Sequence, residues 1–124
     1  MGLFVTLDDM KEPSPTWSGS YGAFYEFRCL LSKLAFGYKH DDTHENKAVN
    51  ILLDHSDCDG KIGHTRAKKL GKTLERLSKD KKRMFVFLLK MTSPEWKDFF
   101  IKSLNDWVKL CRKSATSKRP IIFG

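Results

Sequence analysis

The sequence predicts a mainly α-helical (α+β) fold, a compact bundle of four to five helices with a small pair of β-strands formed by its two ends. Apolar residues recur at helical spacing in several segments, turn-forming residues separate these segments, and short β-forming runs stand near both ends. The length of 124 residues and the 40% hydrophobic content fit a single globular domain, residues 1–124.

The two predicted strands are residues 3–7 and 121–123, which are rich in apolar and β-branched side chains. Pro120 precedes the second strand, a position where a missing backbone donor is tolerated. Residues 12–16 contain two prolines and predict a turn-rich connector after the first strand. We expect the two strands to pair with each other.

A first helix is predicted from a cap at Ser18 or Ser20 to about Ala35, with Gly37 as its stop. A shorter helix is predicted over residues 43–53, capped by Thr43. The apolar face of the first helix, and so part of the core, is expected to consist of Phe24, Phe27, Leu31 and Leu34.

After a predicted loop at residues 54–63, Thr65 is expected to cap a third helix whose apolar face holds residues 67, 70, 74 and 77. The apolar run 84–89 fits a strand or a buried helix, and its lysine flanks and short connection favour helix. The last helix is predicted to begin at Ser93, with Pro94 in its first turn, and to end near Lys113 before a loop at residues 114–118.

Charge is distributed very unevenly along the chain. Residues 1–60 hold five Lys or Arg against ten Asp or Glu, residues 61–90 hold eleven against two, and residues 91–124 hold seven against three. The net charge of +8 is therefore concentrated after residue 60. Such segregation favours a local positive field that can hold an anion.

The basic segment predicts a ligand-binding surface on the third helix and its extension. An anionic partner, either nucleic acid or a nucleotide, would be held by phosphate contacts, and the alternative interpretation is the solvated side of an amphipathic helix. Tyr21, Tyr25 and Tyr38 are candidates for stacking on a base. The predicted ligand-binding residues are Arg66, Lys68, Lys69, Lys72, Arg76, Lys79, Lys82 and Arg83.

The motif His55-Ser56-Asp57-Cys58-Asp59-Gly60 partly resembles a calcium loop of the EF-hand type. It departs from that pattern at the first position, His55, and at the twelfth, where Arg66 replaces the glutamate. His55, Asp57 and Asp59 suit zinc or another transition metal instead, so a divalent metal is a possible cofactor. The alternative interpretation is a turn at Asp59-Gly60 that only connects two elements.

Three segments together look like a family of small, uncharacterised bacterial and bacteriophage proteins. These are residues 17–24 followed by Phe27-Arg28, the His55-Ser56-Asp57-Cys58-Asp59-Gly60 motif, and the closing residues 120–123. The resemblance implies a standalone cytoplasmic domain of bacterial or phage origin and supplies no activity. The three cysteines form no C-x-x-C pair, and no apolar run of 18 residues occurs, which also favours a cytoplasmic protein without a membrane partner.

The sequence therefore predicts a small, non-enzymatic protein that captures an anionic partner on a basic helical face. A second hypothesis is an interaction module that inhibits a host or partner protein, for which exposed Trp17, Phe36 or Phe123 would be the sign. A third is a metal-dependent phosphodiesterase or nuclease that uses the His55 loop.

Overall fold

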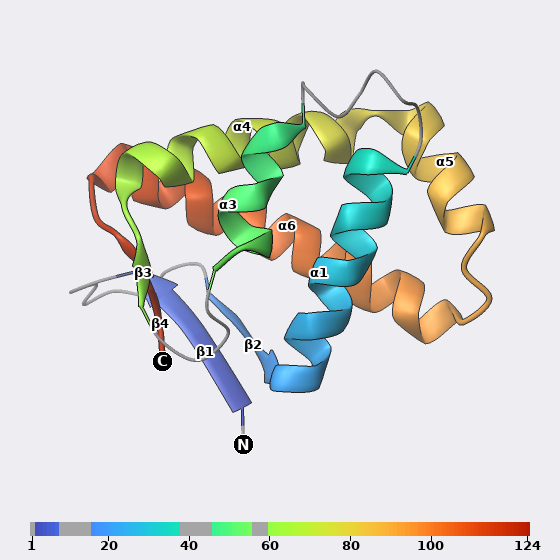
Figure 1. Ribbon diagram of the computed structural model, residues 1–124, viewed down its shortest axis with the longest axis horizontal. Coiled ribbons are helices and arrows are strands. Elements are labelled where there is room, and N and C mark those ends of the chain that lie inside the picture. Colours follow the sequence, from blue (N-terminus) through green and yellow to red (C-terminus); the bar gives the residue numbers. More distant parts are fainter. Residues whose placement is uncertain (1, 8–15, 38–45, 56–59) are drawn as a thin grey trace.

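The computed structural model describes residues 2–7, 16–37, 46–55 and 60–124 (Figure 1). In these residues five α-helices, one short 3-10 helix and a four-stranded sheet confirm the predicted mainly α-helical (α+β) class. The elements in chain order are β1 (Gly2–Leu7), β2 (Trp17–Ser20), α1 (Tyr21–Phe36), η1 (Lys47–Val49), α3 (Asn50–Leu53), β3 (Lys61–Ile62), α4 (His64–Lys79), α5 (Lys81–Leu89), α6 (Pro94–Ser117) and β4 (Ile121–Phe123).

The sheet is antiparallel throughout, with the strand order β2-β1-β4-β3. The predicted pairing of the two terminal strands is confirmed, with Leu7 opposite Ile121 and Val5 opposite Phe123. The strands β2 and β3 were not expected. The predicted loop at residues 54–63 contains β3, which has only two residues and forms by pairing with β4.

One face of the sheet packs against the helices at one end of the molecule (Figure 1). Along β1 the side chains of Leu3, Val5 and Leu7 are buried, whereas Phe4 between them is half exposed, as the two-residue period of a strand requires. The buried Trp17 of β2 donates a hydrogen bond from Nε1 to Ser103 Oγ of α6 at 2.9 Å. The sheet is thereby tied to the longest helix.

Helix α1 agrees with its prediction. Ser20 caps it by accepting a hydrogen bond from the Ala23 amide, and the four residues expected on the apolar face are all buried. The helix ends at Phe36, where the Gly37 amide donates to the Lys33 carbonyl. The capping side chain and the helical spacing are both local signals, which is why the sequence identified this element well.

Two predicted helix starts were wrong or lie outside the described residues, and the preference for a helix at residues 84–89 is confirmed. The second helix is η1 followed by α3, and its expected start at Thr43 lies outside the described residues. Helix α4 begins at His64 with Gly63 in the cap position, so Thr65 is a first-turn residue and not the cap. The run at residues 84–89 is helical, within α5, and the Asp80 side chain caps this helix by accepting from the Arg83 amide.

Helix α6 extends to Ser117, beyond the predicted end near Lys113. The hydroxyls of Thr116 and Ser117 donate to carbonyls four residues earlier, so these polar residues are accommodated inside the helix and do not form the predicted loop. Lys118 then ends the helix in the left-handed conformation, with φ 57°.

Helices α4 and α6 run side by side across the molecule in opposite directions (Figure 1). Gly71 of α4 faces Cys111 of α6, and a Cβ atom placed on Gly71 would lie only 2.6 Å from the Cys111 Cβ. Two carbon atoms that are not bonded to each other cannot approach this closely. Glycine therefore permits a backbone approach that any larger residue at position 71 would prevent.

We expect Gly71→Ala to lower the free energy of unfolding by about 1–3 kcal/mol, because the added methyl group must push the two helices apart. Helix propensity alone predicts the opposite sign, a gain of up to about 1 kcal/mol. Urea-induced unfolding measures the difference. Gly22→Ala is the matched control, because a Cβ at this exposed helical position would meet only Ser20 Oγ, at 3.8 Å. Equal stability of the Gly71 variant and the wild type would show that close approach is not required.

Candidate anion-binding cleft between α4 and α6

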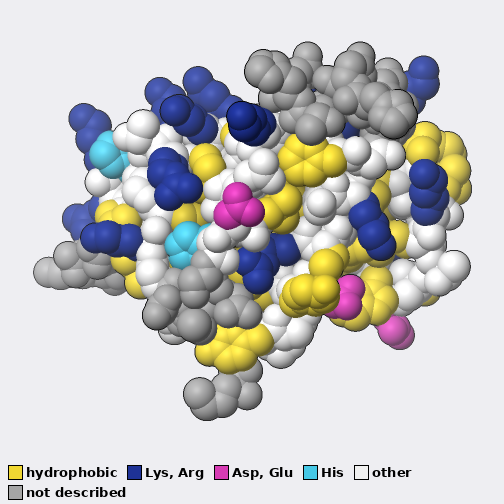
Figure 2. All heavy atoms as spheres, viewed as in Figure 1, with side chains coloured by type: hydrophobic (Ala, Val, Ile, Leu, Met, Phe, Trp, Pro, Cys, Tyr) yellow, Lys and Arg dark blue, Asp and Glu magenta, His cyan; other side chains and the backbone are white. Residues whose placement is uncertain are grey.

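Helix α4 separates its apolar and basic residues onto different sides. Ala67, Leu70, Leu74 and Leu77 are buried, whereas the lysines at positions 68 and 72 are exposed one turn apart. Figure 2 shows Lys and Arg side chains gathered along the edge of the molecule where α4 lies. The same helical period that builds the core thus aligns cations on the outside.

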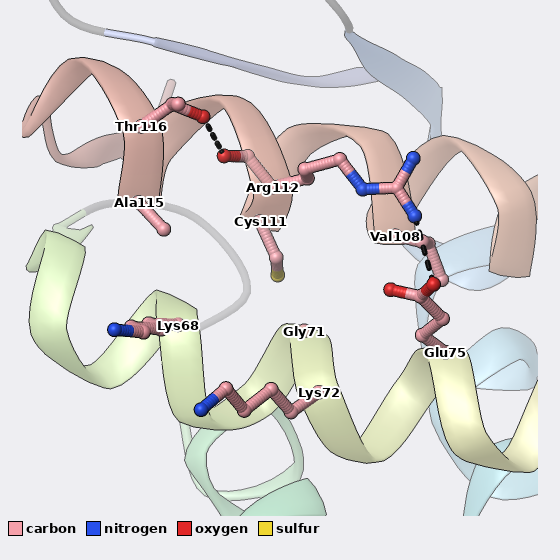
Figure 3. A pocket seen from close by; sticks show the side chains of 9 residues that line it. All are labelled: Lys68, Gly71, Lys72, Glu75, Val108, Cys111, Arg112, Ala115 and Thr116. Atoms are coloured by element: carbon pink, nitrogen blue, oxygen red, sulfur yellow. Dashed lines mark hydrogen bonds and ion pairs between the residues drawn. The ribbon is translucent and has the colours of Figure 1, made fainter.

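A cleft of about 340 Å³ lies between α4 and α6. Its floor is the close contact of Gly71 with Cys111, whose sulfur points toward α4 in Figure 3. Lys68 and Lys72 reach it from α4, and Arg112 reaches it from α6. The lining residues are Lys68, Gly71, Lys72, Glu75, Val108, Cys111, Arg112, Ala115 and Thr116.

Glu75 bridges the two helices at one end of the cleft. Its Oε1 lies 2.9 Å from Lys79 Nζ and 3.0 Å from Arg112 Nη2. The hydrogen bonds from Lys79 and then from Arg112 hold the pKa of the Glu75 carboxyl below its ordinary value near 4.5. Among the described residues that line the cleft, Glu75 is the only acidic one, so Lys68 and Lys72 dominate the charge at its other end.

Cys111 serves packing and not chemistry in this cleft. Its side chain is fully buried, and this burial raises the pKa of the thiol to about 12. The sulfur is therefore protonated at neutral pH, whereas a nucleophile or a metal ligand requires the thiolate. The chemistry that the cleft offers is therefore the noncovalent attraction of an anion by its lysines and arginine.

A second hollow of about 240 Å³ continues the cleft along α6 and shares Arg112 and Thr116 with it. Lys109 and Lys113 line this hollow as well. The sequence prediction missed these cations of α6 because it treated the helix only as a core element. Their spacing of three to four residues, on the side opposite the buried positions, was the available signal.

The predicted cations of α4 do not all meet at one place. Of the eight predicted ligand-binding residues, Lys68 and Lys72 line the cleft, and Lys79 lies next to it as a partner of Glu75. Arg76 donates to Asn46 Oδ1 at 2.5 Å, on the side of α4 that faces η1. The remaining exposed ones, away from the cleft lining, are Arg66 and Lys69 of α4 and Lys82 of α5.

Arg83 corrects the predicted binding surface. Its side chain is only 3% exposed, and its guanidinium donates to the Leu34 carbonyl at 3.0 Å and to Asp80 Oδ2 at 3.2 Å. Carbonyls in the last turn of a helix have no partner inside the helix, and they attract a cation. Arg83 therefore caps α1 from the neighbouring α5 and does not present its charge to a ligand.

The His55 loop is described only in part, because Asp57 and Asp59 lie outside the described residues. The His55 ring stacks on Phe123 with a centroid distance of 4.0 Å, and its Nε2 lies 3.2 Å from the Lys61 carbonyl oxygen. Gly60 has a φ of 96°, which suits the predicted turn. Within the described ranges no group of three His, Cys, Asp or Glu residues converges, and the metal site stays a prediction.

The two predicted stacking residues that the structure describes are not at the cleft. Tyr21 is half-buried and Tyr25 is exposed on α1, and neither belongs to the cleft lining, while Tyr38 lies outside the described residues. The lining residues include no aromatic side chain. A stacking partner for a base is therefore missing from the described part of this site.

Comparisons of the chain with models of protein families, with curated proteins and with solved structures found no match. Among the helices that the structure describes, none combines the length and the apolar character needed to cross a lipid bilayer. The assignment of a function accordingly starts from the chemistry of the cleft.

The bridge made by Glu75 predicts a pH-dependent stability difference. A carboxyl group whose pKa is lowered by folding stabilises the folded state above its ordinary pKa, and this contribution is lost as the pH falls through the lowered value. We expect Glu75→Gln to be less stable than the wild type at pH 7. The difference in melting temperature between the two proteins should shrink in acid, as the wild-type carboxyl becomes protonated, and thermal unfolding measures it. Glu26→Gln, at an exposed position of α1, is the control. A gap that stays constant with pH would contradict an ionic role for Glu75.

Proposed function

We propose that this protein binds nucleic acid through its phosphate backbone, using a basic face formed by Lys68 and Lys72 of α4 with Lys109, Arg112 and Lys113 of α6. This set is the α4–α6 basic face. The observation that carries the proposal is the convergence of cations from two helices around one cleft whose lining includes a single carboxylate. That carboxylate, Glu75, is already paired with Lys79 and Arg112.

Electrostatics supports an anion on this face. Like charges that gather on one surface repel one another, and an anion that neutralises them relieves the repulsion. Positions 68 and 72, and likewise 109 and 113, are one helical turn apart, which places their Cβ atoms about 5–6 Å from each other. These separations are shorter than the Debye length of about 8 Å at physiological ionic strength, so the charges act together.

The shape of the face favours a polymer over a free nucleotide. The cations extend along both helices through two adjoining hollows, as a polyanion requires. A nucleotide pocket generally adds an aromatic surface for the base, and the lining residues provide none. Phosphate contacts carry no sequence information, so we expect binding with little dependence on base sequence.

Charge reversal of the face tests the proposal directly. Lys68→Glu combined with Lys72→Glu is expected to weaken binding of fluorescein-labelled 20-nucleotide DNA, RNA or duplex DNA by at least tenfold. A plot of the logarithm of the binding constant against the logarithm of the salt concentration should become less steep. Its slope should change by about one unit for each phosphate that no longer pairs with a cation. Fluorescence anisotropy between about 50 and 200 mM salt measures both effects.

The matched control is Lys33→Glu with Lys90→Glu, which makes the same charge change on other helices. Equal weakening by both pairs would indicate a general effect of net charge, and undetectable binding of all three probes to the wild type at low salt would overturn the proposal. Displacement of the polymers by stoichiometric ATP or a cyclic dinucleotide would identify a nucleotide as the ligand instead.

Removal of the Glu75 carboxylate separates binding from folding. Glu75→Gln is expected to bind the same nucleic acid probe several-fold more tightly, because the only acidic lining residue is lost and Arg112 is released. The same variant is expected to be less stable at pH 7. A face that is only solvated would not give a variant that binds nucleic acid more tightly and yet unfolds more easily. An unchanged affinity for nucleic acid would argue against contact at this end of the cleft.

A further inference from the structure

A second surface lies between α1 and α5 and is chemically different from the basic face. It is a groove of about 310 Å³. Its walls are mainly apolar, and Lys33 of α1 and Lys90 at the end of α5 add positive charge. The lining residues of this α1–α5 groove are Leu30, Lys33, Leu34, Gly37, Arg83, Val86, Phe87, Lys90 and Met91. None of them is acidic, and none belongs to the α4–α6 cleft.

A large apolar side chain is exposed at one end of the groove. A hollow that shares Leu30, Lys90 and Met91 with the groove extends it to Trp96, which is 41% exposed, and Glu26 also lines this hollow. Phe85 and Leu89 of α5 are 64% and 65% exposed, but helical spacing places them on the side of α5 away from the groove-lining Arg83, Phe87 and Lys90. Figure 2 shows hydrophobic side chains beside Lys and Arg at the edge of the molecule formed by α5. The apolar walls of the groove and the neighbouring Trp96 form a continuous apolar surface, and such a surface marks an interaction site more often than scattered apolar residues do.

The aromatic residues that the sequence suggested for a protein partner are not the ones exposed. Trp17 and Phe123 are buried in the core beneath the sheet, and Phe36 is half-buried. Of the large hydrophobic residues that are exposed, Trp96 lies beside the groove, and the others are Phe4, Tyr25, Phe85, Leu89 and Ile101. The hypothesis of a protein partner therefore moves from the sheet end of the molecule to the α1–α5 groove.

The groove is held open by a fixed contact. Arg83 of α5 donates from Nη1 to the Leu34 and Ala35 carbonyls of α1, at 3.0 and 3.4 Å, while its Nε donates to Asp80. These bonds join the two walls near one end of the groove. A groove that exists before binding does not spend binding free energy on being formed.

Charge complementarity selects the occupant. The apolar walls require apolar side chains. The described residues that line the groove itself include Lys33 and Lys90 and no carboxylate, and Glu26 lies in the adjoining hollow, so acidic groups are favoured beside the two lysines. Nucleic acid offers charge without an apolar face, and a second copy of this chain would bring together two molecules of net charge +8. We infer that the α1–α5 groove binds an acidic amphipathic helix of a partner protein, with apolar residues in the groove and Asp or Glu beside Lys33 and Lys90.

The test uses a synthetic helical peptide with leucines at positions i, i+3, i+4 and i+7 and glutamates on its other faces. Its control has the same leucines with lysines in place of the glutamates. Titration into ¹⁵N-labelled full-length protein is expected to shift amide signals of residues 30–37 and 83–91 for the acidic peptide, with weaker binding in salt and little response to the basic peptide. Shifts confined to the α4–α6 basic face, equal binding of both peptides, or no shift at millimolar peptide would overturn the inference.

Charge-swapped variants identify the contacts. The variant Lys33→Glu with Lys90→Glu is expected to bind the acidic peptide at least tenfold more weakly and the basic peptide more tightly. Both lysines are exposed, so their replacement should disturb folding little. Thermal unfolding checks that these variants fold. The reciprocal control is the variant Lys68→Glu with Lys72→Glu, which is expected to weaken nucleic acid binding. Its affinity for the acidic peptide should stay within about twofold of the wild type. Loss of peptide binding in the Lys68 and Lys72 variant alone would also overturn the inference.

Discussion

The contact of Gly71 with Cys111 determines how α4 and α6 meet, and much of the molecule follows from it. Because position 71 lacks a side chain, the two backbones approach closely enough for Glu75 to reach Arg112 from the neighbouring helix. The same approach places Lys68 and Lys72 at the edge of a cleft whose other wall is α6. A wider separation would leave the same cations on two independent helices. The electrostatic character of the surface thus depends on a residue that carries no charge.

The elements that could be predicted from the sequence are those with local signals. Ser20 and Ser93 each cap a helix through their own hydroxyls, and the apolar spacing of α1, α4 and α6 marks their buried sides. The strand β3 could not be predicted, because two residues form it only by pairing with a strand some sixty positions away. Arg83 was misassigned for a similar reason. Its sequence neighbours are exposed lysines, and only the fold brings the end of α1 to its guanidinium.

The charged run of the chain divides into parts with different roles once it is folded. Lys68 and Lys72 belong to the cleft, Arg76 bonds to Asn46, and Arg83 joins α5 to α1. Counting cations along the sequence could not separate these roles, because a helix turns successive residues toward different neighbours. The α6 cations of the α4–α6 basic face, which begin 26 residues after Arg83, complete the same surface from the other side.

The position of β4 inside the sheet has a consequence for the order in which the molecule assembles. Residues 121–123 lie between β1 and β3 and pair with residues 5–7, so strands at nearly opposite ends of the sequence must meet. During synthesis, β1 is made more than a hundred residues before its partner on this side. Contacts of such long range form slowly compared with those between neighbouring helices. Until β4 pairs with it, β1 has an unpaired edge on this side, and an unpaired strand edge is a place where another chain can pair.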